Sequence, residues 1–206
     1  MGIAERKNRE KQDLREKIIQ AASELFLQHG LMGTSVRMIA QKIEYSPATI
    51  YNYFESKEEL YALVIKRGFQ LLHGYTKPTI NIQNPVHRIH AMAESFMQFA
   101  RDYPNYYRLL PMLKGLPRDG PKSRKEIYLL LENSVKICLG NNQFSHYHLG
   151  TTSVFIWVML HGLATLAITG EVGSPMPPLE KRLSDSAFLP LFDMMLSGLI
   201  GANHKN

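Results

Sequence analysis

Apolar residues recur at intervals of three and four along almost the whole 206-residue chain, and no sustained alternation of apolar and polar residues competes with them. These intervals place side chains on one face of an α-helix, whereas a half-buried strand needs a period of two. The pattern therefore predicts an all-α fold. Its first stripe consists of Leu14, Ile18, Ala22, Leu25 and Phe26.

Composition limits the class of protein. Hydrophobic residues make up 45% of the chain and charged residues 20%, which is typical of a globular protein and excludes collagen-like or wholly disordered chains.

The single cysteine, Cys138, cannot form an internal disulfide, which favours a cytoplasmic location. We expect no signal peptide, because the N-terminus is charged throughout and no apolar segment follows it. A net charge of +6 is compatible with a nucleic-acid partner, but residues 1–67 hold 11 Lys and Arg against 9 Asp and Glu. The net charge therefore does not locate a site.

One segment needs a membrane test. Residues 151–170 contain no Asp, Glu, Lys or Arg and are long enough to span a bilayer. Their Thr, Ser and His residues, and the lack of Lys or Arg close to either end, favour a helix buried in protein. We therefore expect no membrane association, with a membrane-associated helical protein as the alternative.

Capping signals divide the N-terminal part into short helices. The expected N-terminal caps are, in chain order, Asp13 with Glu16, Thr34 or Ser35, Ser46 followed by Pro47, and Ser56 with Glu59. Hydroxyl and carboxylate side chains accept hydrogen bonds from the free N–H groups of a first turn, and Gly30 fits a helix end. The charged residues before Asp13 are interpreted as a solvated helical extension, with a basic arm that reaches DNA as the alternative.

The second and third short helices are separated by a turn at residues 43–46, so residues 35–54 have the spacing of a helix-turn-helix motif. In such a motif the second helix lies in the major groove of DNA. Its side chains suit that task, since Ser46, Thr49 and Asn52 can hydrogen-bond to bases or phosphates and tyrosine hydroxyls can donate to phosphates. Arg37 can reach a guanine edge or a phosphate, and Lys57 begins the next helix, where it can bind a phosphate.

The run IIQAASELFLQHG, then TSVRMIAQKI, then SPATIYNYFESKEELYALV resembles the DNA-binding domain of the TetR family of transcriptional regulators. The resemblance covers residues 12–72. It implies DNA contacts at Ser35, Arg37, Ser46, Ala48, Thr49, Tyr51, Asn52, Tyr53 and Lys57. Many members have Gly where Glu44 or Tyr45 stands, and many have His or Arg at Asn52 and Tyr53. The turn conformation therefore stays open, because a residue with a positive φ would be strained without Gly, and the operator sequence cannot be borrowed from a relative.

Residues 73–206 are expected to form a second domain of longer helices. The predicted helices are 85–102, 104–114, 123–139, 146–168 and 184–200. The resemblance implies that the last two form a homodimer and that the others enclose a small-molecule pocket. The charge-free helix and the apolar Phe188, Leu191, Phe192, Met195, Leu196 and Leu199 support the dimer independently.

Aromatic and methionine residues could line such a pocket, although each of them could equally be ordinary core. The candidates are Phe96, Tyr103, Tyr107, Trp157 and His161, with Met92, Met97, Tyr106, Met112, Phe155 and Met159 as further ones. They would suit a largely apolar or aromatic effector.

Signals of catalysis are weak. His146 and His148 form an H-x-H pair without a third ligand at metal spacing, and no nucleophile, phosphate-loop or dinucleotide motif occurs. We therefore expect no enzyme, metal or cofactor. The sequence predicts instead a dimeric repressor that binds a palindromic operator and is released by a small molecule. The basic residues Lys114, Arg118, Lys122, Arg124 and Lys125 cluster around one loop without an assigned role.

Overall fold

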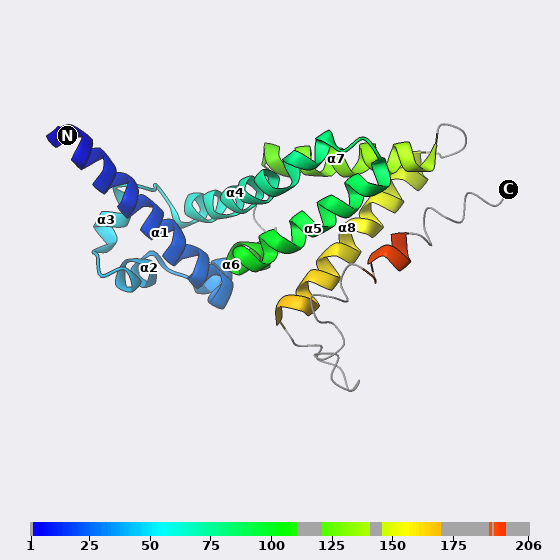
Figure 1. Cartoon of the computed structure of the whole chain (residues 1–206). Helices are drawn as coiled ribbons and strands as arrows, with labels where there is room; N and C mark the ends of the chain where they lie inside the picture. The colour runs from blue at the N-terminus through cyan, green and yellow to red at the C-terminus, as the bar shows by residue number, and fades with distance from the viewer. Residues whose placement is uncertain (1, 111–120, 141–145, 170–189, 191, 197–206) are drawn as a thin grey trace. The chain divides into compact units, whose positions relative to one another are not determined.

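The computed structural model describes residues 2–110, 121–140, 146–169, 190 and 192–196, and every regular element in these ranges is helical (Figure 1). This confirms the predicted all-α fold. The elements are α1 (Ile3–Gly33), α2 (Val36–Lys42), α3 (Pro47–Tyr51), α4 (Lys57–Thr76), the 3-10 helix η1 (Lys77–Asn81), α5 (Pro85–Asp102), α6 (Pro104–Leu109), α7 (Lys122–Leu139) and α8 (His146–Thr169).

The chain divides into two compact units. The first unit is Met1–Phe69 with Asn105–Gly120, and the second is Gln70–Pro104 with Pro121–Asn206. The division falls inside α4, so one continuous helix passes from the first unit into the second.

In the first unit, α1 packs on α2 and α2 packs on α3 (Figure 1). The residues that fill this core are Ile18, Ala22, Phe26, Ile39, Ala40, Ile50, Leu60 and Val64, each with at most 1% of its surface exposed. The rings of Phe26 and Tyr61 meet edge to face with their centroids 5.0 Å apart. An ion pair of 2.9 Å between Lys42 Nζ and Glu24 Oε2 joins α2 to α1.

The start of α1 confirms the expected helical extension before Asp13 but not the capping box expected at Asp13 and Glu16. The helix begins at Ile3, so Asp13 and Glu16 lie inside it and do not cap it. The N–H of Gly2 donates to Glu5 Oε2 at 2.9 Å, and Arg6 pairs with Glu10 at 3.4 Å one turn further on. The reason is that Glu, Lys, Arg and Gln are good helix formers, so the charged run continues the helix backwards.

Gly30 interrupts α1 near its end, as the sequence predicts. Its backbone has a φ of 67° and a ψ of 177°, a conformation that glycine adopts without strain. The hydroxyl of Thr34 then donates to the carbonyl oxygens of Gly30 at 2.8 Å and of Leu25 at 3.0 Å. These bonds close the turn that leads into α2.

In the second unit, α5, α7 and α8 pack against one another. Asn84 caps α5 by accepting from the N–H groups of Val86 and His87 at 2.9 and 3.1 Å. The guanidinium of Arg88 donates through Nε and Nη2 to the carbonyl of Ile82 at 2.9 and 2.7 Å. The bounds of α5 match the predicted range, and those of α7 and α8 lie within one residue of it.

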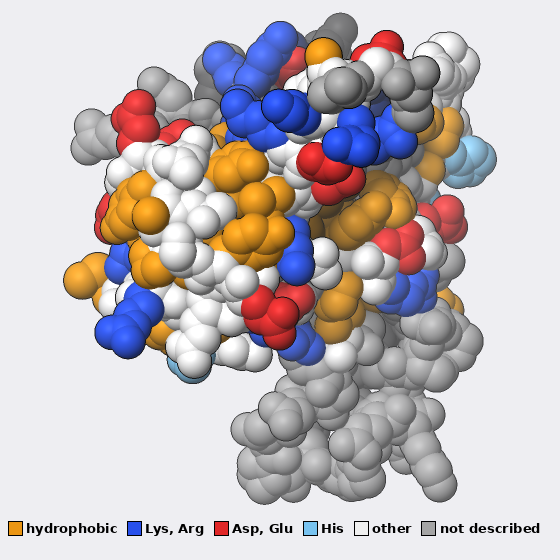
Figure 2. All heavy atoms as spheres, turned by 90° about the vertical axis from the view of Figure 1, so that its left-hand side faces the viewer, with side chains coloured by type: hydrophobic (Ala, Val, Ile, Leu, Met, Phe, Trp, Pro, Cys, Tyr) orange, Lys and Arg blue, Asp and Glu red, His pale blue; other side chains and the backbone are white. Residues whose placement is uncertain are grey.

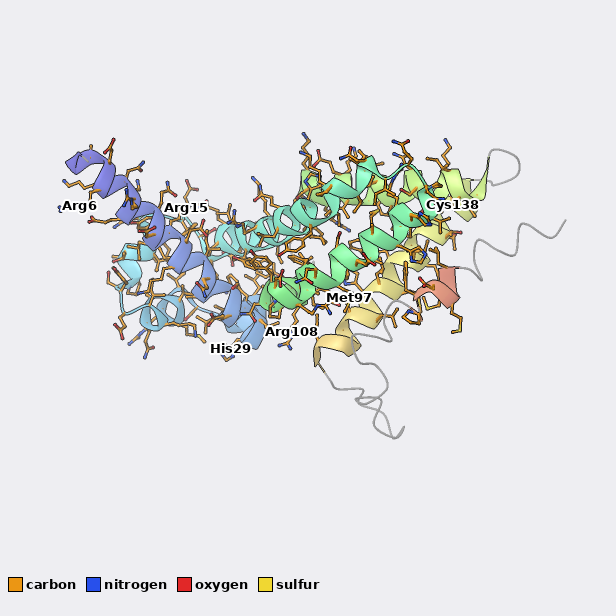
Figure 3. The ribbon with its side chains drawn as sticks, viewed as in Figure 1. Arg6, Arg15, His29, Met97, Arg108 and Cys138 are labelled. Atoms are coloured by element: carbon orange, nitrogen blue, oxygen red, sulfur yellow. The ribbon has the colours of Figure 1, made fainter. Side chains whose placement is uncertain are left out.

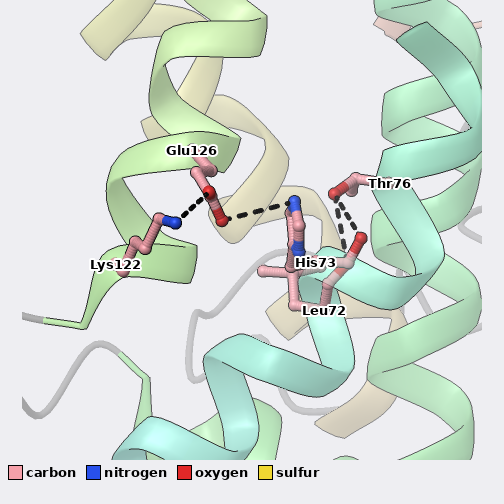
Figure 4. A network of polar contacts seen from close by, with 5 residues as sticks. All are labelled: Leu72, His73, Thr76, Lys122 and Glu126. Carbon is pink, nitrogen blue, oxygen red and sulfur yellow. Dashed lines mark hydrogen bonds and ion pairs between the residues drawn. The ribbon is translucent and has the colours of Figure 1, made fainter.

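A polar network joins the end of α4 to α7 within the second unit (Figure 4). Glu126 lies 3.6 Å from both His73 Nε2 and Lys122 Nζ. The hydroxyl of Thr76 donates to the carbonyl of Leu72 at 3.2 Å.

Of the helix expected at 184–200, the structure describes residues 190 and 192–196, which are helical. Phe192 and Leu196 are buried, and Asp193 pairs with His90 of α5 at 2.8 Å. Several residues named from the sequence lie outside the described ranges, namely Met112, Lys114, Arg118, Phe188, Leu191 and Leu199.

Candidate nucleic-acid interface

The N-terminus of α2 presents two of the predicted contact residues to solvent. Ser35 is the N-cap, and its hydroxyl accepts the N–H of Met38 at 3.2 Å. Arg37 lies in the first turn and is exposed. Ile39 and Ala40 of the same helix are buried, so the packing of this face on the core fixes the orientation of α2.

The turn between α2 and α3 contains a strained residue. Glu44 has a φ of 64°, and it is the one non-glycine residue with a positive φ among those that the structure describes. Glu44 is one of the two positions, with Tyr45, at which many TetR-family members have Gly, and a side chain is unfavourable in the left-handed region. The N–H of Tyr45 donates to the carbonyl of Ala40 at 2.9 Å and closes the turn.

The third helix is short and held by its cap and its buried face. The hydroxyl of Ser46 accepts the N–H of Thr49 at 3.2 Å and lies 3.0 Å from the Thr49 hydroxyl, while Pro47 takes the first turn. This confirms the predicted cap. Ile50 and Phe54 are 1% and 2% exposed, so they anchor the helix and its C-terminal end in the core.

The remaining predicted residues form the outer surface of α3. Ala48, Asn52 and Tyr51 are exposed, Tyr51 to 56%, and Thr49 and Tyr53 are half-buried. Figure 2 views the molecule from the side on which α1, α2 and α3 lie in Figure 1, and basic side chains gather there toward the upper edge. The outer surface thus combines hydroxyl, amide and phenol groups with the nearby Arg37, which suits both phosphate and base contacts.

Lys57 has a role that its sequence position does not reveal. Its ammonium donates to the carbonyls of Leu31 at 2.7 Å and of Thr34 at 2.9 Å, at the turn between α1 and α2. Two of its three N–H donors are therefore used within the protein, and one remains for a phosphate.

Two cation–π contacts beside α3 were missed from the sequence. The guanidinium of Arg15 lies 5.3 Å from the ring centre of Phe54, and the ammonium of Lys17 lies 5.7 Å from that of Tyr45. Tyr45 precedes α3 and Phe54 follows it, so the segments that flank α3 contact α1. The contacts join residues far apart in sequence, so spacing gives no signal for them.

In the second unit, three of the predicted pocket residues meet. The ring centroids of Phe96 and Trp157 are 5.7 Å apart, those of Phe96 and His161 4.8 Å, and those of Trp157 and His161 4.7 Å. Burial lowers the pKa of His161 to about 4, so its imidazole is uncharged at neutral pH. We call these three residues the aromatic cluster.

The other two predicted pocket residues lie elsewhere. Tyr103 stacks on Phe99 at 6.0 Å and meets Tyr75 edge to face at 6.2 Å. The hydroxyl of Tyr75 donates to Asp102 at 2.5 Å, which raises the pKa of Tyr75 to about 12. Tyr107 belongs to the first unit, where it is buried.

Within the described part of the chain, no group of three His, Cys, Asp or Glu side chains is arranged to hold a metal ion. None of the described helices combines the length and the apolarity needed to cross a bilayer.

Comparison with known families decides the identity. Residues 18–64 match the family of bacterial regulatory proteins described as the tetR family, and residues 89–187 match the tetracyclin repressor-like C-terminal domain. The chain belongs to the TetR family. It is therefore a DNA-binding transcriptional regulator and not an enzyme, as the sequence predicts.

A curated helix-turn-helix regulator is similar to part of this chain. The negative transcriptional regulator IcaR of the biofilm operon icaADBC of Staphylococcus aureus is 28% identical over 107 residues, which is 52% of this chain and 56% of IcaR. The chain thus matches about half the length of this curated relative.

Solved TetR-family structures share the fold. A TetR-like regulator from Rhodococcus sp. RHA1 has a TM-score of 0.71 at 20% identity, over 91% of this chain and 96% of its own. The structure of AibR in complex with isovaleryl coenzyme A and operator DNA has a TM-score of 0.65 at 19% identity, over 89% and 96%.

Proposed function

We propose that this TetR-family regulator is a cytoplasmic repressor that binds a palindromic operator as a homodimer and releases it when a small molecule binds its second unit. The observation that carries the proposal is the outer surface of α3. Its polar side chains are exposed while Ile50 and Phe54 hold the helix from behind. A helix anchored in this way can enter a major groove without rearranging the core.

Arg37 and Tyr51 would have different roles in this complex. A guanidinium can bind the O6 and N7 atoms of guanine with two hydrogen bonds, which distinguishes bases. A phenol hydroxyl on α3 would donate to a phosphate, which adds affinity without sequence preference. The resemblance assigns the neighbouring Ser35, Ser46, Ala48, Thr49, Asn52, Tyr53 and Lys57 to the same interface.

Dimerisation is supported by the outer face of α8. Val154, Phe155 and Val158 are 50%, 43% and 56% exposed. Among the α8 residues whose burial the structure describes, the further exposed positions are the uncharged Thr151, Gly162 and Thr165. A second copy of the same face would bury these apolar groups in an isologous contact. Two α3 helices related by that symmetry could then bind the two halves of a palindrome.

An effector site is supported by the aromatic cluster of Phe96, Trp157 and His161. Aromatic faces suit an apolar or planar compound, and a neutral imidazole can donate one hydrogen bond and accept another. AibR, which has the same fold, is known in complex with isovaleryl coenzyme A and operator DNA. The proposed effector is accordingly a small, largely apolar or aromatic molecule.

The proposed coupling runs through α4, which belongs to both units. An effector that favours one orientation of this helix would change the separation of the two α3 helices in the dimer. Repression then depends on the difference in effector affinity between the two states. Repression itself is proposed from IcaR, which is a negative regulator.

Selection of bound duplexes from a random DNA pool tests the proposal. The full-length protein should enrich a palindrome, and Tyr51→Ala should weaken binding to every enriched duplex by at least about tenfold. Arg37→Ala should in addition relax the preference at one base pair in each half-site. Tyr51→Phe keeps the ring and lacks only the hydroxyl, so it should weaken binding much as Tyr51→Ala does. Arg37→Lys keeps the charge but cannot form the two parallel hydrogen bonds, so it should relax the base preference while keeping most of the affinity. Failure to enrich any palindrome would count against the proposal.

The dimer is tested separately by sedimentation at micromolar protein concentration. Val158→Glu should convert the dimer to a monomer by placing a charge in the apolar contact. Ile137→Glu is the control, because Ile137 is 57% exposed on α7 and lies outside the proposed interface. Equal effects of the two substitutions would contradict the assignment of the α8 face.

A further inference from the structure

The N-terminal end of α1 has one purely basic face. Lys7, Lys11 and Arg15 follow one another at intervals of four and therefore lie on the same side of the helix. Lys7 and Lys11 precede the half-buried Leu14 and the buried Ile18 by seven positions, or about two turns. The face that packs on the rest of the first unit further along α1 thus continues toward the N-terminus as a basic surface. We call Lys7, Lys11 and Arg15 the basic face.

The acidic residues of this segment do not compensate the basic face. Glu5, Asp13 and Glu16 fall on other sides of α1, and Glu10 pairs with Arg6 at 3.4 Å. Lys7 and Lys11 are exposed, and neither has an ion-pair partner among the residues that the structure describes. Like charges four residues apart destabilise a helix by a few tenths of a kcal/mol. The spacing of Lys7, Lys11 and Arg15 therefore does not serve to stabilise α1.

The basic face begins beside the segment that holds α3. Arg15 contacts Phe54, which follows α3, and Lys17 contacts Tyr45, which precedes it. The residues on either side of the helix proposed to enter the major groove therefore lie against α1 at these positions. At about 1.5 Å per residue, Lys11 and Lys7 lie about 6 and 12 Å further along α1 than Arg15. Figure 3 shows Arg6 on the free end of α1 and Arg15 nearer its middle.

We propose that Lys7 and Lys11 bind the sugar–phosphate backbone at the border of the major groove that α3 occupies, and so extend the DNA contact from α2 and α3 onto α1. This inference rests on the proposed function. When a helix lies in a major groove, the two backbones that border the groove stand on either side of it. Duplex DNA carries about one negative charge per 1.7 Å, so a basic helical face that continues past α3 meets a surface of opposite charge. The contact is continuous with the proposed interface and is not sequence-specific.

The test compares two double variants of the full-length dimer. Lys7→Gln with Lys11→Gln removes the two free charges of the basic face. Arg6→Gln with Arg9→Gln removes the same charge from the same segment but from other sides of α1. Dissociation constants are measured by fluorescence anisotropy between 50 and 300 mM salt, on the duplex enriched by selection and on an unrelated duplex of equal length.

The basic-face variant should bind both duplexes at least about tenfold more weakly. The slope of log K against log salt should fall by about 2 per protomer, since each lost phosphate contact removes about 0.9. The control variant should change affinity less than about threefold. Far-ultraviolet circular dichroism should report unchanged helix content in both variants, which separates a lost contact from a lost helix.

Equal losses in the two variants, or wild-type affinity in the basic-face variant, would overturn the inference. The proposed function still holds after either result, provided that the wild type binds DNA and Tyr51→Ala weakens that binding. If the wild type binds no duplex, the proposed function and the inference both fail.

Discussion

The helix-turn-helix of the first unit and the aromatic cluster of the second unit hold their functional groups by different forces. Ser35 and Ser46 are fixed by hydrogen bonds to residues three positions along, and most of the residues proposed to contact DNA remain exposed. Phe96 and His161 lie on different helices and are fixed by packing against each other. The first site is local and solvent-facing, whereas the second exists only when α5 and α8 are packed.

This difference predicts how substitutions will act. An exposed group on a capped helix can be removed with little effect on stability, so its loss should appear in DNA binding. A group inside the aromatic cluster supports the fold, so its loss should appear in the free energy of unfolding. Four predictions test the contrast, all measured by chemical denaturation at a fixed protomer concentration because dimerisation adds to apparent stability.

Phe96→Ala should have the largest effect. Phe96 is 2% exposed and contacts Trp157 and His161, so truncation should lower the free energy of unfolding by about 3–5 kcal/mol. Tyr51→Ala, at a residue that is 56% exposed, should change it by less than about 0.5 kcal/mol. A comparable loss in the two variants would break the contrast between the units.

The stability contributed by neutral His161 should depend on pH. Its pKa is about 4 in the folded protein and about 6.5 in the unfolded chain, so the unfolded state binds the extra proton in this range. The contribution of His161 to the free energy of unfolding should therefore be fully present above about pH 6.5. It should decline as the pH falls toward 4, by at most about 1.4 kcal/mol per pH unit. Denaturation of the wild type and of His161→Gln between pH 7.5 and 5 isolates the effect, because only the wild type should show this component. Parallel curves would contradict it.

Lys57→Met should lower stability by about 1–3 kcal/mol in the absence of DNA. The ammonium donates to the carbonyls of Leu31 and Thr34, which would lose a charged partner. Full stability combined with weaker DNA binding would instead assign Lys57 to phosphate contact alone. The variant thus tests whether this half-buried residue, proposed to contact DNA, also supports the fold of the first unit.

Glu44→Gly should have the smallest effect and the opposite sign. Removing a side chain from a φ of 64° relieves about 1–2 kcal/mol of strain, and the greater freedom of glycine in the unfolded chain offsets part of that gain. The expected net stabilisation is up to about 1 kcal/mol. Glu44→Ala keeps the Cβ atom and should give no such gain, so equal behaviour of the two variants would argue against strain.

The same contrast explains what could be predicted from the sequence. The cap at Ser46 and the cap at Thr34 or Ser35 could be predicted because a cap depends on residues three positions away, and the structure assigns the second one to Ser35. The two carbonyl partners of Lys57 lie 26 and 23 residues away, and no local pattern encodes them. The predicted cap at Asp13 was wrong because the spacing of Asp13 and Glu16 also fits the interior of a helix. Tyr107 was predicted to line the same pocket as Phe96 because both are aromatic, but the residue type carries no information about which unit a side chain packs in.

The shortness of α3 has an evolutionary consequence. A helix of 5 residues has little intrinsic stability, so its conformation depends on the cap and on Ile50 and Phe54. The exposed positions Ala48, Tyr51 and Asn52 contribute almost nothing to that scaffold. Mutation can therefore alter operator preference while folding is preserved, and descendants of one ancestral regulator can acquire new target genes by changing a few codons.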